Sequence, residues 1–415
     1  MKKILCLLYL FIFACTLNSQ WVNVNSNITN DITNISFISY FTGYASTFST
    51  SDSSGRIMKS VNGGINWFPS ITQTRPMYNV YTPDASLVFG VGKAYVWVST
   101  NGGNSWLERY FGDQYELYDI RFQNYLSAYV CGYNNITSRA ILVRSSDRGT
   151  IWNVTFNLEL NRRLYSVRFP NPIIGYACGE QGLMKKVVEG VTFWDTQNTP
   201  TTQNLNCLYF FNAETGFAAG NNSTLLRTTN GGSPWSLVVT GFTNVSFRSI
   251  QFYDNSTGYL VGSNGFIARS TNGGLNWVQQ TTTNSNQING INFINRDTLY
   301  AAGDAGTILS TFNGGNPIGI NLISNSAPGE FKINQNYPNP FNPATNIEFE
   351  IPENSFVSLI VYDQLGKVVE NLVNNELKPG TYKYSWNASS YPSGVYFYKI
   401  QAGEFVQTKK MILIK

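Results

Sequence analysis

Ser270-Thr271-Asn272-Gly273-Gly274-Leu275-Asn276-Trp277 belongs to a set of similar segments that recur along the chain, at a period of about 40 residues. Close copies begin at Ser60, Ser99, Ser145 and Thr228, and they end at Trp67, Trp106, Trp152 and Trp235. A weaker copy runs from Gly190 to Trp194, and another, from Thr311 to Gly315, has Ile318 where a Trp is expected. Self-similarity at this period is typical of solenoids and propellers.

Each repeat contains short apolar stretches separated by Gly, Asn, Asp and Ser. In the copy quoted above, residues 250–252 and 258–262 precede the turn, residues 266–269 lead into it, and the Trp segment follows. Aromatic and β-branched residues are frequent in these stretches, and no helical periodicity is present. The pattern predicts four antiparallel strands per repeat and an all-β fold.

The last repeat lacks a Trp strand, but Gln20-Trp21-Val22-Asn23-Val24 is similar to Asn276-Trp277-Val278-Gln279-Gln280 and has no turn before it. We therefore expect the two ends of the repeat region to complete one sheet. This closure would remove the exposed edges of an open array. The prediction is a seven-bladed β-propeller over residues 20–319, with outer strands marked by Trp21, Trp67, Trp106, Trp152, Trp194, Trp235 and Trp277.

The turns resemble the Asp-box, or BNR, hairpin Ser-x-Asp-x-Gly-x-x-Trp of sialidases, sortilin-type receptors, xyloglucanases and photosystem II assembly-factor propellers, with Asn usually replacing Asp. The layout of residues 21–319 is most similar to the assembly-factor propellers, and that resemblance implies a binding scaffold. Physically the motif is a turn device, because Asx and Ser bond nearby amides and Gly accepts positive φ. A calcium site is the alternative, but the single carboxylate Asp147 is a poor ligand set. We expect no metal and no cofactor.

The N-terminus has the pattern of a secretion signal over residues 1–19, with Lys2 and Lys3 followed by an apolar run from Ile4 to Ala14. This run is too short to cross a bilayer, so no transmembrane segment is expected. A lipoprotein signal at Cys15 is the alternative. Cleavage would lower the formal net charge of +4 by two, and such a weak balance argues against nucleic-acid binding.

After residue 335 the repeats stop and the segment Asn336-Tyr337-Pro338-Asn339-Pro340-Phe341 begins a different pattern. Alternating stretches at 346–351, 357–362, 381–386, 394–400 and 405–415 predict a small immunoglobulin-like β-sandwich, preceded by a linker over residues 320–335. This tail resembles the type A sorting domain of the type IX secretion system, through Pro338 to Phe341, Val361 to Gly366, Gly380 to Tyr382, Ser393 to Phe397 and Lys409 to Met411. The resemblance implies that residues 336–415 are recognised by the type IX translocon, which carries the protein from the periplasm to the cell surface or the medium.

The composition restricts the chemistry that the chain can perform. It contains no histidine, which excludes Ser-His and Cys-His nucleophiles and the usual catalytic zinc ligands. Three cysteines follow the signal, Cys131, Cys178 and Cys207, and their odd number favours buried small residues over a disulfide framework. Carboxylates on loops, Asp113, Glu116, Glu180 and Asp304, leave a glycoside hydrolase open, although no spacing pairs them. We assign no catalytic residue.

A ligand would be expected at the innermost strands, where some positions keep an apolar residue in every repeat and others vary. The varying positions are Ser36, Tyr81, Arg121, Arg168, Tyr209, Gln251 and Asn292. Two consecutive repeats carry Tyr-x-x-Arg, at Tyr118 to Arg121 and Tyr165 to Arg168. Arg248 lies close in sequence to the varying position Gln251. Tyr118, Arg121, Tyr165, Arg168 and Arg248 are therefore the candidate ligand-binding residues. The alternative is that they bridge neighbouring blades.

The sequence thus predicts a secreted or surface-attached, non-enzymatic propeller that binds a protein or a glycan. A secreted glycoside hydrolase and a structural adhesion protein remain the alternatives.

Overall fold

A computed structural model describes residues 21–415, except residues 25, 40, 189–193, 283, 297, 312–313, 315–319, 325 and 389–390. The predicted signal, residues 1–19, lies outside the described residues. The chain divides into two compact units, Met1–Gly315 and Asn316–Lys415.

The strands described in the first unit form seven four-stranded antiparallel sheets, which we call blades 1 to 7. Blade 1 contains β2 (Asp31–Phe37), β3 (Gly43–Phe48), β4 (Gly55–Ser60) and β5 (Phe68–Gln73). Blade 2 contains β6 (Met77–Tyr81), β7 (Val88–Gly92), β8 (Tyr95–Ser99) and β9 (Leu107–Tyr110). Blade 3 contains β10 (Tyr115–Phe122), β11 (Ala128–Asn134), β12 (Arg139–Ser145) and β13 (Asn153–Leu160). Blade 4 contains β14 (Leu164–Arg168), β15 (Gly175–Gly179), β16 (Met184–Val187) and β17 (Asp195–Thr196), with the 3-10 turn η1 (Glu180–Gly182).

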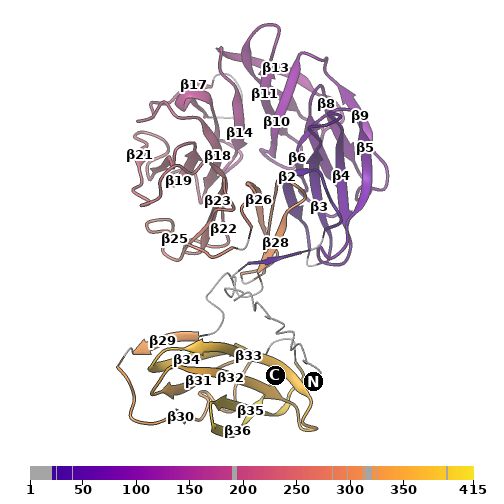
Figure 1. The fold of residues 1–415 in the computed structure, drawn as a ribbon. Helices are drawn as coiled ribbons and strands as arrows, with labels where there is room; N and C mark the ends of the chain where they lie inside the picture. The colour runs from indigo at the N-terminus through magenta and orange to yellow at the C-terminus, as the bar shows by residue number, and fades with distance from the viewer. Residues whose placement is uncertain are drawn as a thin grey trace, which may run out of the picture. The chain divides into compact units, whose positions relative to one another are not determined.

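Blade 5 contains β18 (Leu205–Phe210), β19 (Gly216–Gly220), β20 (Leu225–Thr228) and β21 (Ser236–Leu237). Blade 6 contains β22 (Phe247–Phe252), β23 (Gly258–Gly262), β24 (Ile267–Ser270) and β25 (Val278–Gln279). Blade 7 contains β26 (Ile288–Phe293), β27 (Leu299–Gly303), β28 (Ile308–Thr311) and β1 (Val22–Asn23). The innermost strands β2, β6, β10, β14, β18, β22 and β26 contact one another in this order, and β26 contacts β2, so the blades form a closed ring (Figure 1).

The closing blade joins the two ends of the repeat region, as the sequence predicts. Strand β1 pairs with β28, with Val22 opposite Ser310. Trp21 is fully buried beside it, 5.9 Å from the ring of Tyr259 in an edge-to-face contact, and its indole Nε1 donates to Gln280 Oε1 at 3.3 Å. The first strand of the described chain therefore stabilises the last sheet of the ring.

The repeated turns have the structural role that the motif predicts. Ser60 Oγ accepts a hydrogen bond from the Gly64 amide at 2.9 Å, and Asn62 Oδ1 accepts one from the Asn66 amide at 3.0 Å. Gly64 has a φ of +81°, which costs little without a Cβ. The Trp67 indole donates to the Gly64 carbonyl at 3.0 Å. The turn thus satisfies its own backbone and anchors the Trp at the start of the outermost strand.

The single acidic turn uses its carboxylate in the same way. Asp147 Oδ1 accepts from the amides of Ile151 at 2.9 Å and Thr150 at 3.0 Å. These bonds, led by the one from Ile151, lower the pKa of Asp147. No group of three or more acidic or cysteine side chains that could hold a metal ion occurs among the residues that the structure describes.

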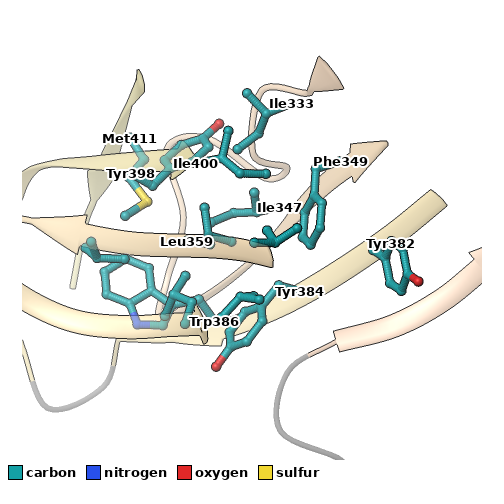
Figure 2. Close-up of a cluster of buried hydrophobic side chains, with 14 of the residues drawn as sticks. Ile333, Ile347, Phe349, Leu359, Tyr382, Tyr384, Trp386, Tyr398, Ile400 and Met411 are labelled. Carbon is teal, nitrogen blue, oxygen red and sulfur yellow. The ribbon is translucent and has the colours of Figure 1, made fainter. Parts of the chain in front are cut away.

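The second unit consists of two four-stranded antiparallel sheets. One has the order β29 (Ile320–Ser324), β34 (Gly380–Asn387), β31 (Ala344–Ile351) and β30 (Lys332–Ile333). The other has the order β33 (Val368–Leu377), β32 (Ser355–Tyr362), β35 (Gly394–Ala402) and β36 (Phe405–Leu413). Alternate residues of β31, β32 and β35 are buried, and side chains of both sheets share one core, including Ile347, Phe349, Leu359, Trp386, Tyr398, Ile400 and Met411 (Figure 2).

The prediction of a linker over residues 320–335 is wrong at two segments, which form strands. Residues 320–324 form β29, which pairs with β34 and places Ile320 opposite Tyr384. Residues 332–333 form β30, which pairs with β31. Both segments are edge strands; β29 has its partner far along the chain, and β30 has only two residues, so no local pattern marks either. Strand β33 was likewise not predicted.

The Asn-Pro-rich opening of this unit holds the end of the chain in place. Asn339 Oδ1 accepts from the Ile412 amide at 2.9 Å, and the Phe341 amide donates to the Ile412 carbonyl at 3.0 Å. Asn336 is nearly fully buried, and its backbone amide donates to Tyr398 Oη at 2.8 Å. The segment that begins the resemblance is thus tied to the C-terminal strand.

Cys131, Cys178 and Cys207 are free and buried, as the sequence predicts. Burial raises the pKa of the Cys207 thiol to about 12. Within the described part of the chain, no helix has the length and apolar character needed to cross a membrane.

Candidate ligand-binding site

A β-bulge interrupts the innermost strand of each blade near its start. In β10, Leu117 pairs with Gly132 and Asp119 with Cys131, so Tyr118 is the extra residue. The same shift recurs in the other innermost strands. The extra residues are Thr33, Tyr78, Tyr118, Tyr165, Asn206, Arg248 and Asn289, which we call the bulge ring. Bulges re-aim side chains and often border functional sites.

A glycine of the second strand faces the bulge in six of the blades. A Cβ on Gly132 would lie 2.1 Å from the Glu116 carbonyl oxygen, and one on Gly262 would lie 2.3 Å from that of Ser246. Only a residue without a side chain therefore lets the bulged backbone come so close. The six are Gly92, Gly132, Gly179, Gly220, Gly262 and Gly303, whereas Thr47 takes this place in blade 1.

All members of the bulge ring line one cavity of about 710 Å³ at this end of the central channel, which we call the channel mouth. Tyr118, Arg121, Tyr165, Arg168 and Arg248, the residues that the sequence singles out, line it together. The seven varying positions from Ser36 to Asn292 line a second cavity of about 300 Å³ further along the channel. Asn34, Arg121, Arg168 and Gln251 line both cavities and mark the boundary between them.

Asp119 organises the boundary and was not predicted from the sequence. Its carboxylate is nearly fully buried and forms ion pairs with Arg121 at 2.8 Å and with Arg168 at 2.5 Å. It also accepts from Asn79 Nδ2 at 3.1 Å and Ser166 Oγ at 3.1 Å. Asp119 thus connects blades 2, 3 and 4, with Asn79 from blade 2 and Arg168 and Ser166 from blade 4, whereas its pair with Arg121 lies within blade 3.

The charge state of Asp119 follows from these contacts. Burial would by itself raise the pKa of the carboxyl, but the guanidinium groups of Arg121 and Arg168 outweigh it and hold the pKa below its usual value. Arg121 also lies over the ring of Tyr81, with its Cζ 4.7 Å from the centroid. Both arginines are therefore held in place and share the charge of one carboxylate.

Half-buried aromatic side chains from blades 1 to 4 follow one another around the channel mouth. These are Phe48, Tyr78, Tyr118 and Tyr165, which we call the aromatic arc. The ring centroids lie 6.5 Å apart between Phe48 and Tyr78, and 5.3 Å apart between Tyr78 and Tyr118. Tyr118 and Tyr165 make an edge-to-face contact at 5.4 Å. Neighbouring rings of the arc therefore contact one another along this side of the cavity.

Carboxylates behind the arc hold two of its hydroxyl groups. Tyr118 Oη donates to Glu116, and Tyr165 Oη donates to Glu180 Oε1 at 2.8 Å. Arg163 bridges these acids, with its NH1 3.1 Å from Glu180 and its Nε 3.8 Å from Glu116. Burial would raise the pKa of Glu180, but Tyr165 and Arg163 lower it overall. Two of the loop carboxylates considered for hydrolysis are thus engaged in orienting tyrosines.

Blades 5 to 7 line the rest of the mouth with amides. Asn206 Nδ2 donates to Asn221 Oδ1 at 2.9 Å, and Gln287 Nε2 donates to Asn289 Oδ1 at 2.8 Å. Arg248 donates through Nε and NH2 to Gln287 Oε1, both at 3.2 Å. We call Asn204, Asn206, Asn221, Gln287 and Asn289, all lining residues of the cavity, the amide wall.

The other two loop carboxylates differ in position. Asp304 lines the cavity and accepts from Asn289 Nδ2 at 2.7 Å. Burial raises its pKa, and the charge of Asp31 adds to this effect. Asp113 instead forms an exposed ion pair with Arg75 at 2.6 Å.

The closed ring of antiparallel sheets around a channel, followed by a two-sheet unit, defines an all-β protein with a β-propeller. Residues 335–415 match the family of the secretion system C-terminal sorting domain. Residues 188–285 and 233–336 match the family of the photosynthesis system II assembly factor YCF48. Both resemblances predicted from the sequence are thereby confirmed, and the sorting domain identifies the chain as cargo of type IX secretion, exported to the cell surface or beyond.

Solved structures show the same fold at low sequence identity. YCF48 bound to a D1 peptide has a TM-score of 0.58 at 19% identity, covering 71% of this chain and 95% of that chain. YCF48 from Cyanidioschyzon merolae has a TM-score of 0.56 at 16% identity, covering 70% and 98%. The WD40 β-propeller domain of Doa1 has a TM-score of 0.53 at 10% identity, covering 70% and 94%. No curated protein matches the chain significantly in sequence.

Proposed function

We propose that the chain is an exported, non-enzymatic binding scaffold. A seven-bladed propeller holds a protein or glycan partner at the channel mouth, and the domain that includes residues 336–415 is recognised by the type IX translocon. The sorting domain supports the export step. The propeller fold supports the scaffold role only in general terms, because the same fold hosts many functions.

The observation that carries the binding role is the convergence of candidate residues from blades 3, 4 and 6 on one cavity of about 710 Å³. This volume lies within the range of small-molecule pockets. The side chains are held in place before any ligand arrives, since Asp119 fixes Arg121 and Arg168, and Glu180 fixes Tyr165. Such preorganisation reduces the entropic cost of binding. The YCF48 propeller solved with a D1 peptide makes a polypeptide one candidate partner.

The test is a binding screen of the purified chain, beginning at residue 20, on glycan and peptide arrays. The variant Arg248→Ala removes an exposed side chain of the mouth, and Arg296→Ala removes an exposed arginine on the loop after β26 as the control. We expect Arg248→Ala to weaken the array signal and Arg296→Ala to leave it unchanged. A signal that neither variant changes would place binding elsewhere and contradict the proposal.

A glycoside hydrolase is the second candidate, favoured by Asp304, whose pKa burial raises in the cavity lining. A general acid needs such a raised pKa. Incubation of the chain with the oligosaccharides that it binds, followed by chromatography of the products, tests this function. Product formation that Asp304→Asn abolishes would establish hydrolysis and overturn the non-enzymatic role.

A further inference from the structure

The chemistry of the channel mouth specifies a ligand class more narrowly than the proposed function does. We propose that the mouth binds an uncharged oligosaccharide, whose sugar rings stack on the aromatic arc and whose hydroxyl groups bond to the amide wall. This inference rests on the proposed function, because it concerns the same cavity.

The aromatic arc provides the first part of the argument. A sugar ring has an apolar face of C–H groups and an edge of hydroxyls, so it packs on aromatic faces that border a polar region. Tyr78, Tyr118 and Tyr165 come from consecutive blades, with neighbouring centroids 5.3 and 5.4 Å apart. Since Glu116 and Glu180 hold the hydroxyls of Tyr118 and Tyr165, the ring orientations are set in advance. An aromatic surface of low conformational entropy is suited to rigid cyclic ligands.

The amide wall provides the second part. Every Asn and Gln side chain carries two N–H donors and a carbonyl oxygen with two lone pairs. Asn206 and Asn289 donate both N–H groups to protein oxygens, so they offer their carbonyl oxygens to sugar hydroxyls. Gln287 donates one N–H to Asn289 and keeps the other for a ligand. Asn206 lies in blade 5, Arg248 lies in blade 6, and Gln287 and Asn289 lie at the start of blade 7, so these side chains line the part of the mouth that the arc leaves. The cavity therefore has an aromatic side and an amide side, as an amphipathic sugar chain requires.

The balance of charge around the mouth provides the third part. Arg121 and Arg168 share Asp119, and Arg163 pairs with Glu180. The arginines in or beside the mouth are Arg121, Arg163, Arg168 and Arg248, and the carboxylates are Asp31, Glu116, Asp119, Glu180 and Asp304. The positive groups are thus matched by acids, so the mouth has no excess of cations to attract an anionic ligand. A neutral ligand suits this balance of charges better than an acidic peptide or an acidic glycan does.

The experiment measures binding of cellohexaose, xylohexaose, mannohexaose and N-acetylchitohexaose to the chain by calorimetry, with an oligogalacturonate and an acidic peptide as charged comparisons. We expect binding of at least one neutral sugar, with an affinity that stays constant between about 50 mM and about 500 mM salt. We expect Tyr118→Ala to weaken it by about tenfold or more. Tyr118→Phe keeps the ring and should stay close to wild type.

Two further variants distinguish loss of the binding site from loss of folding. Tyr78→Ala removes a second ring of the arc, and Tyr110→Ala removes an exposed tyrosine of the outermost strand β9 as the matched control. Near-ultraviolet circular dichroism verifies that each variant is folded. Equal weakening by Tyr78→Ala and Tyr118→Ala, with Tyr110→Ala unchanged, supports the inference.

The outcomes separate the inference from the proposed function. Binding of only the charged glycan or the peptide, lost in Arg248→Ala, would overturn the neutral sugar and keep the binding scaffold. Binding of neutral sugars that is equally strong in Tyr78→Ala and Tyr118→Ala would overturn the stacking site. Absence of binding to every neutral sugar would also overturn the inference.

Discussion

Asp119 of blade 3 and Arg168 of blade 4 form an ion pair of 2.5 Å across the interface between two blades. The same carboxylate binds Arg121 at 2.8 Å, so one buried acid holds two cations. A buried carboxylate with two guanidinium partners is costly to remove, because its loss leaves charges without compensation.

Asp119→Asn should therefore destabilise the propeller by about 3 kcal/mol or more. Differential scanning calorimetry should show a lower melting temperature of the propeller transition. Asp113→Asn, which removes an acid that is 61% exposed in its pair with Arg75, is the control and should change stability by less than about 1 kcal/mol. An Asp119→Asn protein as stable as the wild type would contradict this role for the carboxylate.

The same carboxylate makes stability depend on pH. Because its folded pKa is below the unfolded value, its contribution is complete above a pH of about 4 and is lost as the pH falls through the folded pKa. Denaturant unfolding at several pH values should show that the wild type loses more stability on acidification than Asp119→Asn does. Parallel pH profiles for the two proteins would exclude Asp119 as a source of the dependence.

The closing strand should contribute strongly to stability. A chain that begins at residue 26 lacks β1 and the buried Trp21, and we expect its propeller to melt at a much lower temperature than that of a chain beginning at residue 20. Trp21→Ala alone should cost about 3–5 kcal/mol. Val22→Ala, at a position that is 58% exposed, is the control and should have a small effect. Unchanged melting of the shortened chain would refute the contribution of the shared blade.

The acidic turn should need its acceptor atoms and not its charge. Asp147→Asn keeps an oxygen for the amides of Thr150 and Ile151, so it should change stability little, whereas Asp147→Ala should cost about 1 kcal/mol. Thermal melts of the two variants measure the difference. Calcium should leave the wild-type melting temperature unchanged, and a calcium-dependent rise that Asp147→Ala abolishes would restore the metal-site interpretation.

Export should depend on the complete second unit. A chain that ends at residue 315 should fold and accumulate in the periplasm, as fractionation and immunoblotting would show. Fusion of residues 316–415 to a periplasmic reporter should direct the reporter outward. Residues 336–415 should direct it less well, because they lack the edge strands β29 and β30. Normal export of the chain ending at residue 315 would refute the sorting role.

The sequence predicted those features that the repeats display directly. The apolar stretches between turn residues predicted the four strands of each sheet, and the similarity of residues 20–24 to 276–280 predicted the pairing of β1 with β28. The varying positions of the innermost strands also identified residues that line the channel. These features depend on local periodicity, which a single sequence retains.

The features that the sequence did not predict depend on contacts between residues of different blades or distant strands, which local periodicity does not reveal. Asp119 occupies an ordinary position between Tyr118 and Ile120, and only the bulge together with the neighbouring blade brings it to Arg168. A signal was nevertheless present, because glycines such as Gly262 end the second strands where they face the bulges. Strand β29 was missed because its partner β34 lies about sixty residues later.

The bulges give the propeller a way to change its ligand without changing its fold. An extra residue has no counterpart in the register of the neighbouring strand, so replacing Tyr118 or Asn206 leaves the ladder of backbone hydrogen bonds intact. Every blade supplies one such position to the same opening. A substitution at the bulge of one blade therefore changes the ligand preference of the mouth while the other blades keep their residues.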